Sequence, residues 1–260
     1  MNKKTVWIII VALLLLTSYG FLSRKSDLPV DDNSPITATS TSNLDFDIGG
    51  DGDFVVEQVP INEGIPAPDL ARPIVFPAGV SEEFKRIMTE RINKTSAELK
   101  KNPENIDVWL DLAIHRKTID DYKGAAEIWE YVLEFQPDNS VVLGNLGELY
   151  HLYLKDYPKS ENYYKSAIAL DQTRIALYRG LHELYKYSYK KETTAAADIL
   201  KIGLERNPDN TDLLILLGVY YKDTGDKKSA RLYYTEALSI AKVAGNTQFA
   251  EAIERDLQGL

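Results

Sequence analysis

Three histidines and a group of aspartates are the side chains of this 260-residue chain whose types could support chemistry. His115, His151 and His182 lie far apart along the sequence. No two of them have the i, i+4 spacing by which ligands on one helix converge on a metal ion. The chain has no cysteine, which excludes disulfides and thiolate metal sites. We therefore predict packing or surface positions for the histidines, and neither a metal nor a cofactor.

The aspartates do not complete a calcium loop. The ranges 45–47 and 51–53 each hold an Asp-x-Asp pair, as calcium loops do. However, Gly49 occupies a ligand position, and Val56 stands where such a loop needs a bidentate glutamate. The glycines of residues 49–52 follow no predicted strand and open no predicted helix, which argues against a phosphate-binding loop. Nor is a nucleophile motif visible, so the sequence predicts a protein that is not an enzyme.

The elements that must position any site follow from a repeated pattern in the second half of the chain. A large residue recurs at intervals of 34, 35 and 36 residues, at Trp109, Leu143, Tyr178 and Leu214. Three residues later comes one of the leucines Leu112, Leu146, Leu181 and Leu217. Four residues beyond these leucines stand Arg116, Tyr150, Tyr185 and Tyr221. A second helix carries a small residue at Ala125, Ser160, Ala196 and Ala230, and a bulky one four residues on at Trp129, Tyr164, Leu200 and Tyr234.

These positions have the periodicity of paired amphipathic helices. Within residues 143–150 the landmarks fall at i, i+3, i+4 and i+7, which forms one apolar stripe on a helix. Small residues on this stripe let two helices approach closely. Pro-x-Asn triplets at 103–105, 137–139 and 208–210 separate the copies, because proline stops a helix and Asn caps the next one.

The pattern resembles that of the tetratricopeptide repeat (TPR) family, which is aromatic-x2-Leu-Gly-x2-Tyr, then Ala-x3-aromatic, then Pro. The best matches are Trp109-x2-Leu112-Ala113 with Ala125-x3-Trp129 and Pro137, and Leu214-x2-Leu217-Gly218-x2-Tyr221 with Ala230-x3-Tyr234. The resemblance implies an all-α fold, a right-handed α-solenoid of about four TPR helix pairs. The repeats are expected at about 106–139, 140–174, 175–210 and 211–244.

The ends of the repeat array need cover, because terminal repeats have no neighbour to bury their apolar face. We predict a helix within 81–101 that precedes the first repeat, and a capping helix over 247–257 that completes a TPR domain of residues 106–260. Residues 72–105 are predicted as an extended proline-rich strip followed by that leading helix. The apolar, proline-rich residues 65–80 are expected to dock along the first helices. Whether they occupy the groove is left open.

The N-terminal segment reads as a membrane anchor. Residues 6–16 are an unbroken apolar run, and Lys3 and Lys4 precede it. We predict that residues 1–25 form a single transmembrane helix in the cytoplasmic membrane, with the amino end inside and the repeats outside. A cleaved signal peptide, which would give a secreted protein, is the alternative.

A charged linker is expected between this anchor and the repeats. Residues 26–71 contain ten acidic residues and no Lys or Arg, and we predict a disordered tether there. The remainder of the chain is nearly balanced in charge and has no basic stripe, so nucleic-acid binding is not expected.

The TPR resemblance implies a concave groove, lined by the first helix of each pair, that binds extended or helical peptides. By helical spacing the candidate residues are Leu110, Ile114, Lys117, Val141, Glu148, His151, Arg179, Glu183, Lys186, Ile215, Val219 and Lys222. The family's clamp for a C-terminal carboxylate uses Lys and Asn in the first repeat, where this chain has Leu110 and Ile114. An apolar-anchored peptide or partner helix is therefore the expected ligand.

Together these features predict a membrane-tethered TPR scaffold that mediates protein–protein interaction on the extracytoplasmic side. The sequence does not identify the protein or peptide partner. The alternative is a secreted or self-assembling structural solenoid of the cell envelope.

Overall fold

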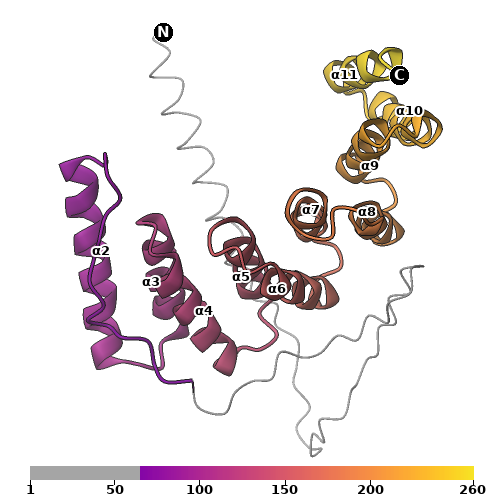
Figure 1. The fold of residues 1–260 in the computed structure, drawn as a ribbon. Helices are drawn as coiled ribbons and strands as arrows, with labels where there is room; N and C mark the ends of the chain where they lie inside the picture. Colours follow the sequence, from indigo (N-terminus) through magenta and orange to yellow (C-terminus); the bar gives the residue numbers. More distant parts are fainter. Residues whose placement is uncertain (1–64) are drawn as a thin grey trace, which may run out of the picture. The chain divides into compact units, whose positions relative to one another are not determined.

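The computed structural model describes residues 65–260, which form ten α-helices and one π-helical turn and contain no strand (Figure 1). The elements are α2 (Glu82–Lys101), α3 (Ile106–Thr118), α4 (Tyr122–Phe135), α5 (Ser140–Leu152), α6 (Tyr157–Leu170), α7 (Ile175–Glu183), η1 (Leu184–Ser188), α8 (Ala195–Arg206), α9 (Thr211–Asp223), α10 (Lys227–Val243) and α11 (Thr247–Gln258). The predicted all-α fold is confirmed for residues 65–260. The anchor predicted at 1–25 and most of the linker predicted at 26–71 lie outside the described residues, and those boundaries stay predictions.

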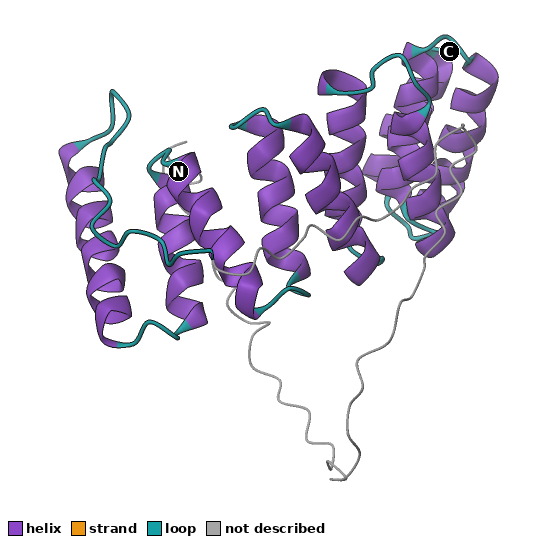
Figure 2. Cartoon of the chain, turned by 60° about the horizontal axis from the view of Figure 1, so that its bottom comes forward, coloured by secondary structure: helices purple, strands orange, loops and turns teal. Residues whose placement is uncertain are grey.

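The helices pack in chain order as successive pairs. α3 packs on α4, α5 on α6, α7 on α8 and α9 on α10, and each second helix also contacts the first helix of the next pair. The loops of the described residues therefore gather at two opposite edges of the stack (Figure 2). One edge holds the turns within pairs, and the other holds the turns between pairs. Among the described helices, none is both long enough and apolar enough to cross a membrane.

Side-chain caps explain where most helices begin. Asn residues cap the first helices α3, α5 and α9 by accepting a hydrogen bond from the backbone N–H three residues later; these are Asn105, Asn139 and Asn210. Aspartates cap the second helices α4, α6 and α10 in the same way; these are Asp121, Asp156 and Asp226. The start of α7 has no such cap, because Arg174 occupies that position.

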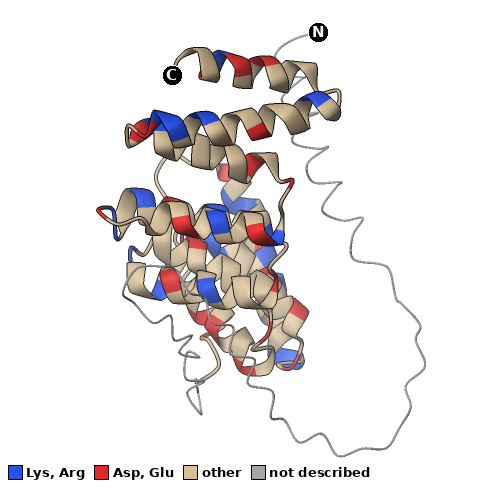
Figure 3. Cartoon of the chain, turned by 90° about the vertical axis from the view of Figure 1, so that its right-hand side faces the viewer, with Lys and Arg blue, Asp and Glu red and all other residues tan. Residues whose placement is uncertain are grey.

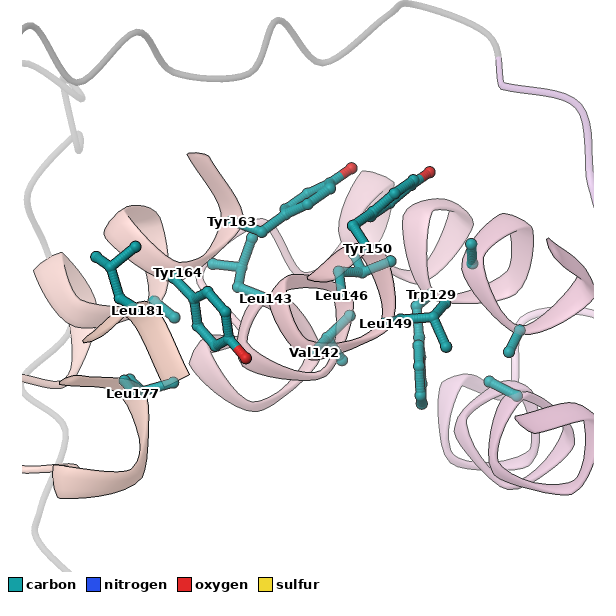
Figure 4. Close-up of a cluster of buried hydrophobic side chains, with 14 of the residues drawn as sticks. Trp129, Val142, Leu143, Leu146, Leu149, Tyr150, Tyr163, Tyr164, Leu177 and Leu181 are labelled. Carbon is teal, nitrogen blue, oxygen red and sulfur yellow. The ribbon is translucent and has the colours of Figure 1, made fainter. Parts of the chain in front are cut away.

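The repeated apolar residues form the core. One cluster of buried side chains extends from α2 to α9, and a second joins α9, α10 and α11. Figure 4 shows the fully buried Leu146 of α5 in the first cluster, with Trp129 of α4 on one side and Tyr164 of α6 on the other. A Cβ atom at Gly147 would lie 2.8 Å from the Tyr164 ring. The glycine thus allows the close helix approach that the sequence pattern predicts.

The third pair departs from the pattern at two places. His182 replaces the small residue of the other copies, and the buried Leu200 occupies the repeat position at which the other copies have an aromatic ring. The His182 Nδ1–H donates to the backbone oxygen of Ala196 at 2.7 Å, so the ring is buried with its donor satisfied. After Glu183 the first helix continues as the π-helical turn η1. This turn accommodates extra residues, which explains the lengthened period of the third copy.

Residues 65–80 pack against the first helices. Leu70, Ile74 and Phe76 contact the first apolar cluster, and the Phe76 ring meets Phe84 of α2 edge-on with the ring centroids 6.2 Å apart. The strip therefore docks on the first helices, as its apolar composition predicts. It takes the position in the chain that the first helix of a preceding pair would occupy, with α2 as the second helix.

Candidate protein-interaction surface

The twelve residues predicted to line the groove lie on α3, α5, α7, η1 and α9, and we call them the first-helix face. Four are exposed: Ile114, Val141, Arg179 and Lys222. Seven are partly buried: Leu110, Lys117, Glu148, Glu183, Lys186, Ile215 and Val219. His151 is buried. That these residues line a single groove stays a prediction.

The lysines of the first-helix face form ion pairs with the next helix pair along the stack. The Lys117 Nζ lies 2.7 Å from Glu148 Oε1, so α3 is joined to α5. The Lys186 Nζ lies 2.7 Å from an oxygen of Asp223, which joins η1 to α9. These pairs engage two of the four Lys and Arg residues of the face, whereas Arg179 is exposed.

The same arrangement continues at the end of the stack. The Lys222 Nζ of α9 lies 3.3 Å from Asp256 of α11.

Burial alone would lower the pKa of Lys186, but hydrogen bonds to Asp223 and Tyr187 raise it overall. The Lys186 ammonium group therefore stays charged within its pair, and the charged part of the face holds successive repeats together.

His151 is a structural residue of this face. It is 6% exposed, and its Nε2 lies 3.1 Å from the Ser188 hydroxyl of η1. Burial lowers the pKa of His151, which favours the neutral ring at neutral pH. His151 therefore joins α5 to the π-helical turn and is not presented to a ligand.

Two aliphatic side chains remain free on the first-helix face. Leu110 packs against the first apolar cluster, and Ile215 and Val219 pack against the second. Ile114 of α3 and Val141 of α5 are each 51% exposed. They are the apolar members of the face that are available to a partner.

Two exposed residues next to this face were missed by the sequence analysis. Leu152 is 48% exposed and Tyr187 is 60% exposed, and they directly follow His151 and Lys186 in the chain. The signal was present, because both stand at the same position of their repeats, one residue after a predicted face residue. They stand at the ends of their first helices, beside the turns within pairs.

A second set of contacts explains the residues that follow the repeat leucines. The Tyr150 hydroxyl donates to Glu130 of the preceding pair at 2.6 Å, and the Tyr185 hydroxyl donates to Glu161 of the preceding pair at 2.6 Å. The first repeat has no preceding pair. Its equivalent residue is Arg116, which binds the strip.

Arg116 holds the strip through its backbone. Although only 2% exposed, its guanidinium group donates to the backbone oxygens of Arg72 at 2.7 Å and Pro73 at 2.8 Å. Asp121 lies between the two arginines, 3.3 Å from Arg116 Nη1 and 2.8 Å from Arg72 Nε. Arg72 also pairs with Glu127 at 2.6 Å. None of the strip's partners in this network belongs to the first-helix face.

The three histidines do not come together. His151 and His182 have the separate partners described above, and His115 lies half-buried on α3. Within residues 65–260, no group of three His, Cys, Asp or Glu side chains is placed to hold a metal ion. In the view of Figure 3, Lys and Arg positions of the described helices are interspersed with Asp and Glu, and no continuous basic stripe is seen there.

Comparisons with known proteins agree with this architecture. The family model described as tetratricopeptide repeat matches residues 211–243, which span α9 and α10. A crystal structure of MamA is similar with a TM-score of 0.53 and 18% sequence identity, covering 66% of this chain and 99% of that chain. The structure described as the functional characterization of Pseudomonas aeruginosa pilF has a TM-score of 0.48 and 20% identity, covering 67% of this chain and 85% of that chain. No curated protein sequence matches the chain. The family match shows a tetratricopeptide repeat at residues 211–243, and the likeness to MamA, at 18% identity, shows a similar fold of stacked helix pairs.

Proposed function

We propose that this protein is a membrane-tethered TPR scaffold that binds a peptide or a partner helix on its first-helix face. The observation that carries the proposal is that the lysines of this face are paired within the protein while two of its aliphatic side chains are exposed. Lys117, Lys186 and Lys222 are paired with carboxylates of neighbouring repeats, while Ile114 and Val141 stay half-exposed. A partner anchored by apolar side chains suits this surface better than a free carboxylate does.

The magnitudes support an apolar anchor. Covering an exposed aliphatic side chain stabilises a complex by about 1.5–3 kcal/mol at most, and proportionally less when it is already half-buried. Ile114 and Val141 alone therefore give weak binding. An amphipathic partner helix that also covered Leu152 and Tyr187 would bind more tightly.

The membrane tether is the second part of the proposal. It rests on the apolar run at 6–16 and on the acidic composition of residues 26–71. A tether raises the effective concentration of the repeats at the membrane without any further contact. With the amino end inside, the repeats would act on the outer side of the cytoplasmic membrane.

The binding surface is tested by comparing full-length variants in proximity labelling and affinity capture from the native host. Ile114→Asp and Val141→Asp place a charge on the proposed anchor, whereas Val243→Asp changes an 89% exposed valine of α10 and serves as the matched control. We expect the first two variants to lose partners that the control retains, with thermal melting unchanged in all three. Equal partner recovery in all variants would contradict the assignment.

The tether is tested separately. Membrane pellets washed with carbonate should retain the full chain, and protease added to intact spheroplasts should remove a tag placed after Leu260. A soluble protein whose first residue lies beyond position 18 would instead show a cleaved signal peptide.

A further inference from the structure

The turns within helix pairs have a common backbone conformation. One residue of each turn has a positive φ: Asp120 (63°), Lys155 (57°), Lys190 (59°) and Gly225 (84°). For residues other than glycine this conformation costs about 1–2 kcal/mol. In the fourth turn this position is Gly225, which adopts a positive φ without strain, so the turn geometry does not require a larger residue there. The second and third turns nevertheless carry lysine.

These two turns are rich in lysine. Residues 152–160 and 186–194 together contain five lysines and two carboxylates. Lys190 is paired with Glu161 at 2.8 Å, and Lys186 is paired within the first-helix face. Lys159 donates to the Tyr150 hydroxyl at 3.4 Å.

The two remaining lysines, Lys155 and Lys191, are exposed and have no ion-pair partner among the described residues. Of the two carboxylates, Asp156 caps α6 and Glu192 is exposed. The two turns therefore carry a local excess of positive charge within a repeat domain that is close to neutral.

Exposed aromatic and aliphatic side chains lie beside these lysines. Tyr187 is 60% exposed, Leu152 48% and Tyr153 39%. The rings of Tyr157 and Tyr189 lie 6.3 Å apart, which places the second and third turns next to each other. The lysines and the apolar side chains therefore belong to one edge of the stack.

We propose that this edge, the turn surface of Leu152, Tyr153, Lys155, Tyr187 and Lys191, docks on an anionic lipid surface. Tyrosine rings and lysines are the side chains that favour the boundary between lipid and water. Each lysine near an anionic membrane strengthens binding about fivefold. The contacts come from separate turns at an edge of the stack, which suits a fluid surface that requires no side-chain complementarity. The proposal shares Leu152 and Tyr187 with the longer partner helix considered above, but it rests on none of the twelve residues of the first-helix face.

The test uses the absence of native cysteine. A Tyr187→Cys variant of the full chain is labelled with an aromatic, polarity-sensitive fluorophore and reconstituted with phosphatidylcholine vesicles containing either no or 30% phosphatidylglycerol. We expect a blue shift of the emission only with the anionic vesicles. The matched control is Val243→Cys at the end of α10, on the edge of the turns between pairs. The emission of its label should stay that of a fluorophore in water with both kinds of vesicle.

Adding Lys155→Gly and Lys191→Ser should weaken the docking equilibrium by about thirtyfold, as expected from two lysines. The same Lys155→Gly change should leave the melting temperature equal or higher, because glycine relieves the positive φ. Loss of the shift therefore cannot come from unfolding. An equal shift with neutral vesicles, or an unchanged shift in the lysine variant, would overturn the proposal. A shift with soluble poly-glutamate and none with vesicles would assign the surface to an acidic protein and overturn it as well.

Discussion

The two ends of the repeat stack are closed by different kinds of contact. At the N-terminal end, the apolar contacts of the strip are joined by buried polar bonds, in which Arg116 binds two backbone oxygens and shares Asp121 with Arg72. At the C-terminal end, the amphipathic helix α11 covers α10 with apolar side chains such as Ile253. A terminal repeat can therefore be covered without a further repeat, provided that its apolar face is buried and its polar groups find partners.

The difference predicts unequal sensitivity to substitution. Arg116→Ala should destabilise the protein most, by about 3–5 kcal/mol, because it leaves two backbone oxygens without their buried partner and removes one of the two arginines that pair with Asp121. Urea unfolding followed by circular dichroism measures the loss. Arg72→Ala, at a more exposed member of the same network, is the control and should cost less. A loss below about 1 kcal/mol for Arg116→Ala would show that the strip is held by its apolar contacts alone.

At the other end, Ile253→Ala should cost about 2–4 kcal/mol, through lost burial and the cavity left behind. Because Ile253 belongs to the second apolar cluster, the effect should be local. Hydrogen exchange should accelerate in α11 and α10 while α2, α3 and α4 keep their protection. Uniform acceleration along the whole stack would mean that the two clusters unfold as a single unit.

A fall in pH should act on the middle of the stack. Burial lowers the pKa of His182, more than its hydrogen bond to Ala196 raises it, from an ordinary value of 6.5. Below pH 6.5 the unfolded chain therefore binds a proton that the folded chain rejects, and stability falls. The loss is at most about 1.4 kcal/mol per pH unit for this group. Unfolding at pH 7.5 and 5.5 should show a smaller difference in His182→Gln than in the wild type. An unchanged difference would remove His182 as a cause.

Glu161 adds a second contribution in the middle of the stack. Burial would raise its pKa, but hydrogen bonds from Lys165, Lys190 and Tyr185 outweigh burial and hold the pKa below its usual value. Its stabilising effect is present at neutral pH and is lost as pH falls through that lowered pKa. The loss from His182 should therefore come first on acidification, and the loss from Glu161 later.

The smallest effect is expected at the exposed ion pair between Lys222 and Asp256. Lys222→Ala should change stability by about 0.2–1 kcal/mol, since water and salt screen such pairs. Thermal melting at low and high salt measures this difference. A larger loss would mean that α11 depends on polar contacts, as the strip does, and the contrast between the two ends would fail.

The apolar periodicity and the Pro-x-Asn triplets were enough to predict the helix pairs, because packing at the recurring leucines is local to each repeat and its neighbour. Leu146 is fully buried and Gly147 meets Tyr164, as the pattern requires. The sequence analysis allowed a packing or a surface position for His182, and the structure shows it buried where the other copies have small residues.

The candidate surface could be predicted less completely from the sequence. Helical spacing placed Lys117, His151 and Lys186 on one face, but it did not show that their partners lie in the following repeat. Leu152 and Tyr187 occupy the same position of their repeats, but the helical spacing used to predict the face did not include that position.

Repetition in the amino-acid sequence by itself determined which side chains are buried between helices, since each repeat buries the same stripe against the next. Only the tertiary structure decided which polar groups remain free for a partner. Arg116 forms hydrogen bonds with the strip, and Lys117 forms an ion pair with Glu148. Both contacts depend on the spacing between adjacent helices. Such contacts depend on distances of a few ångströms between residues far apart in the chain, which a one-dimensional pattern does not contain.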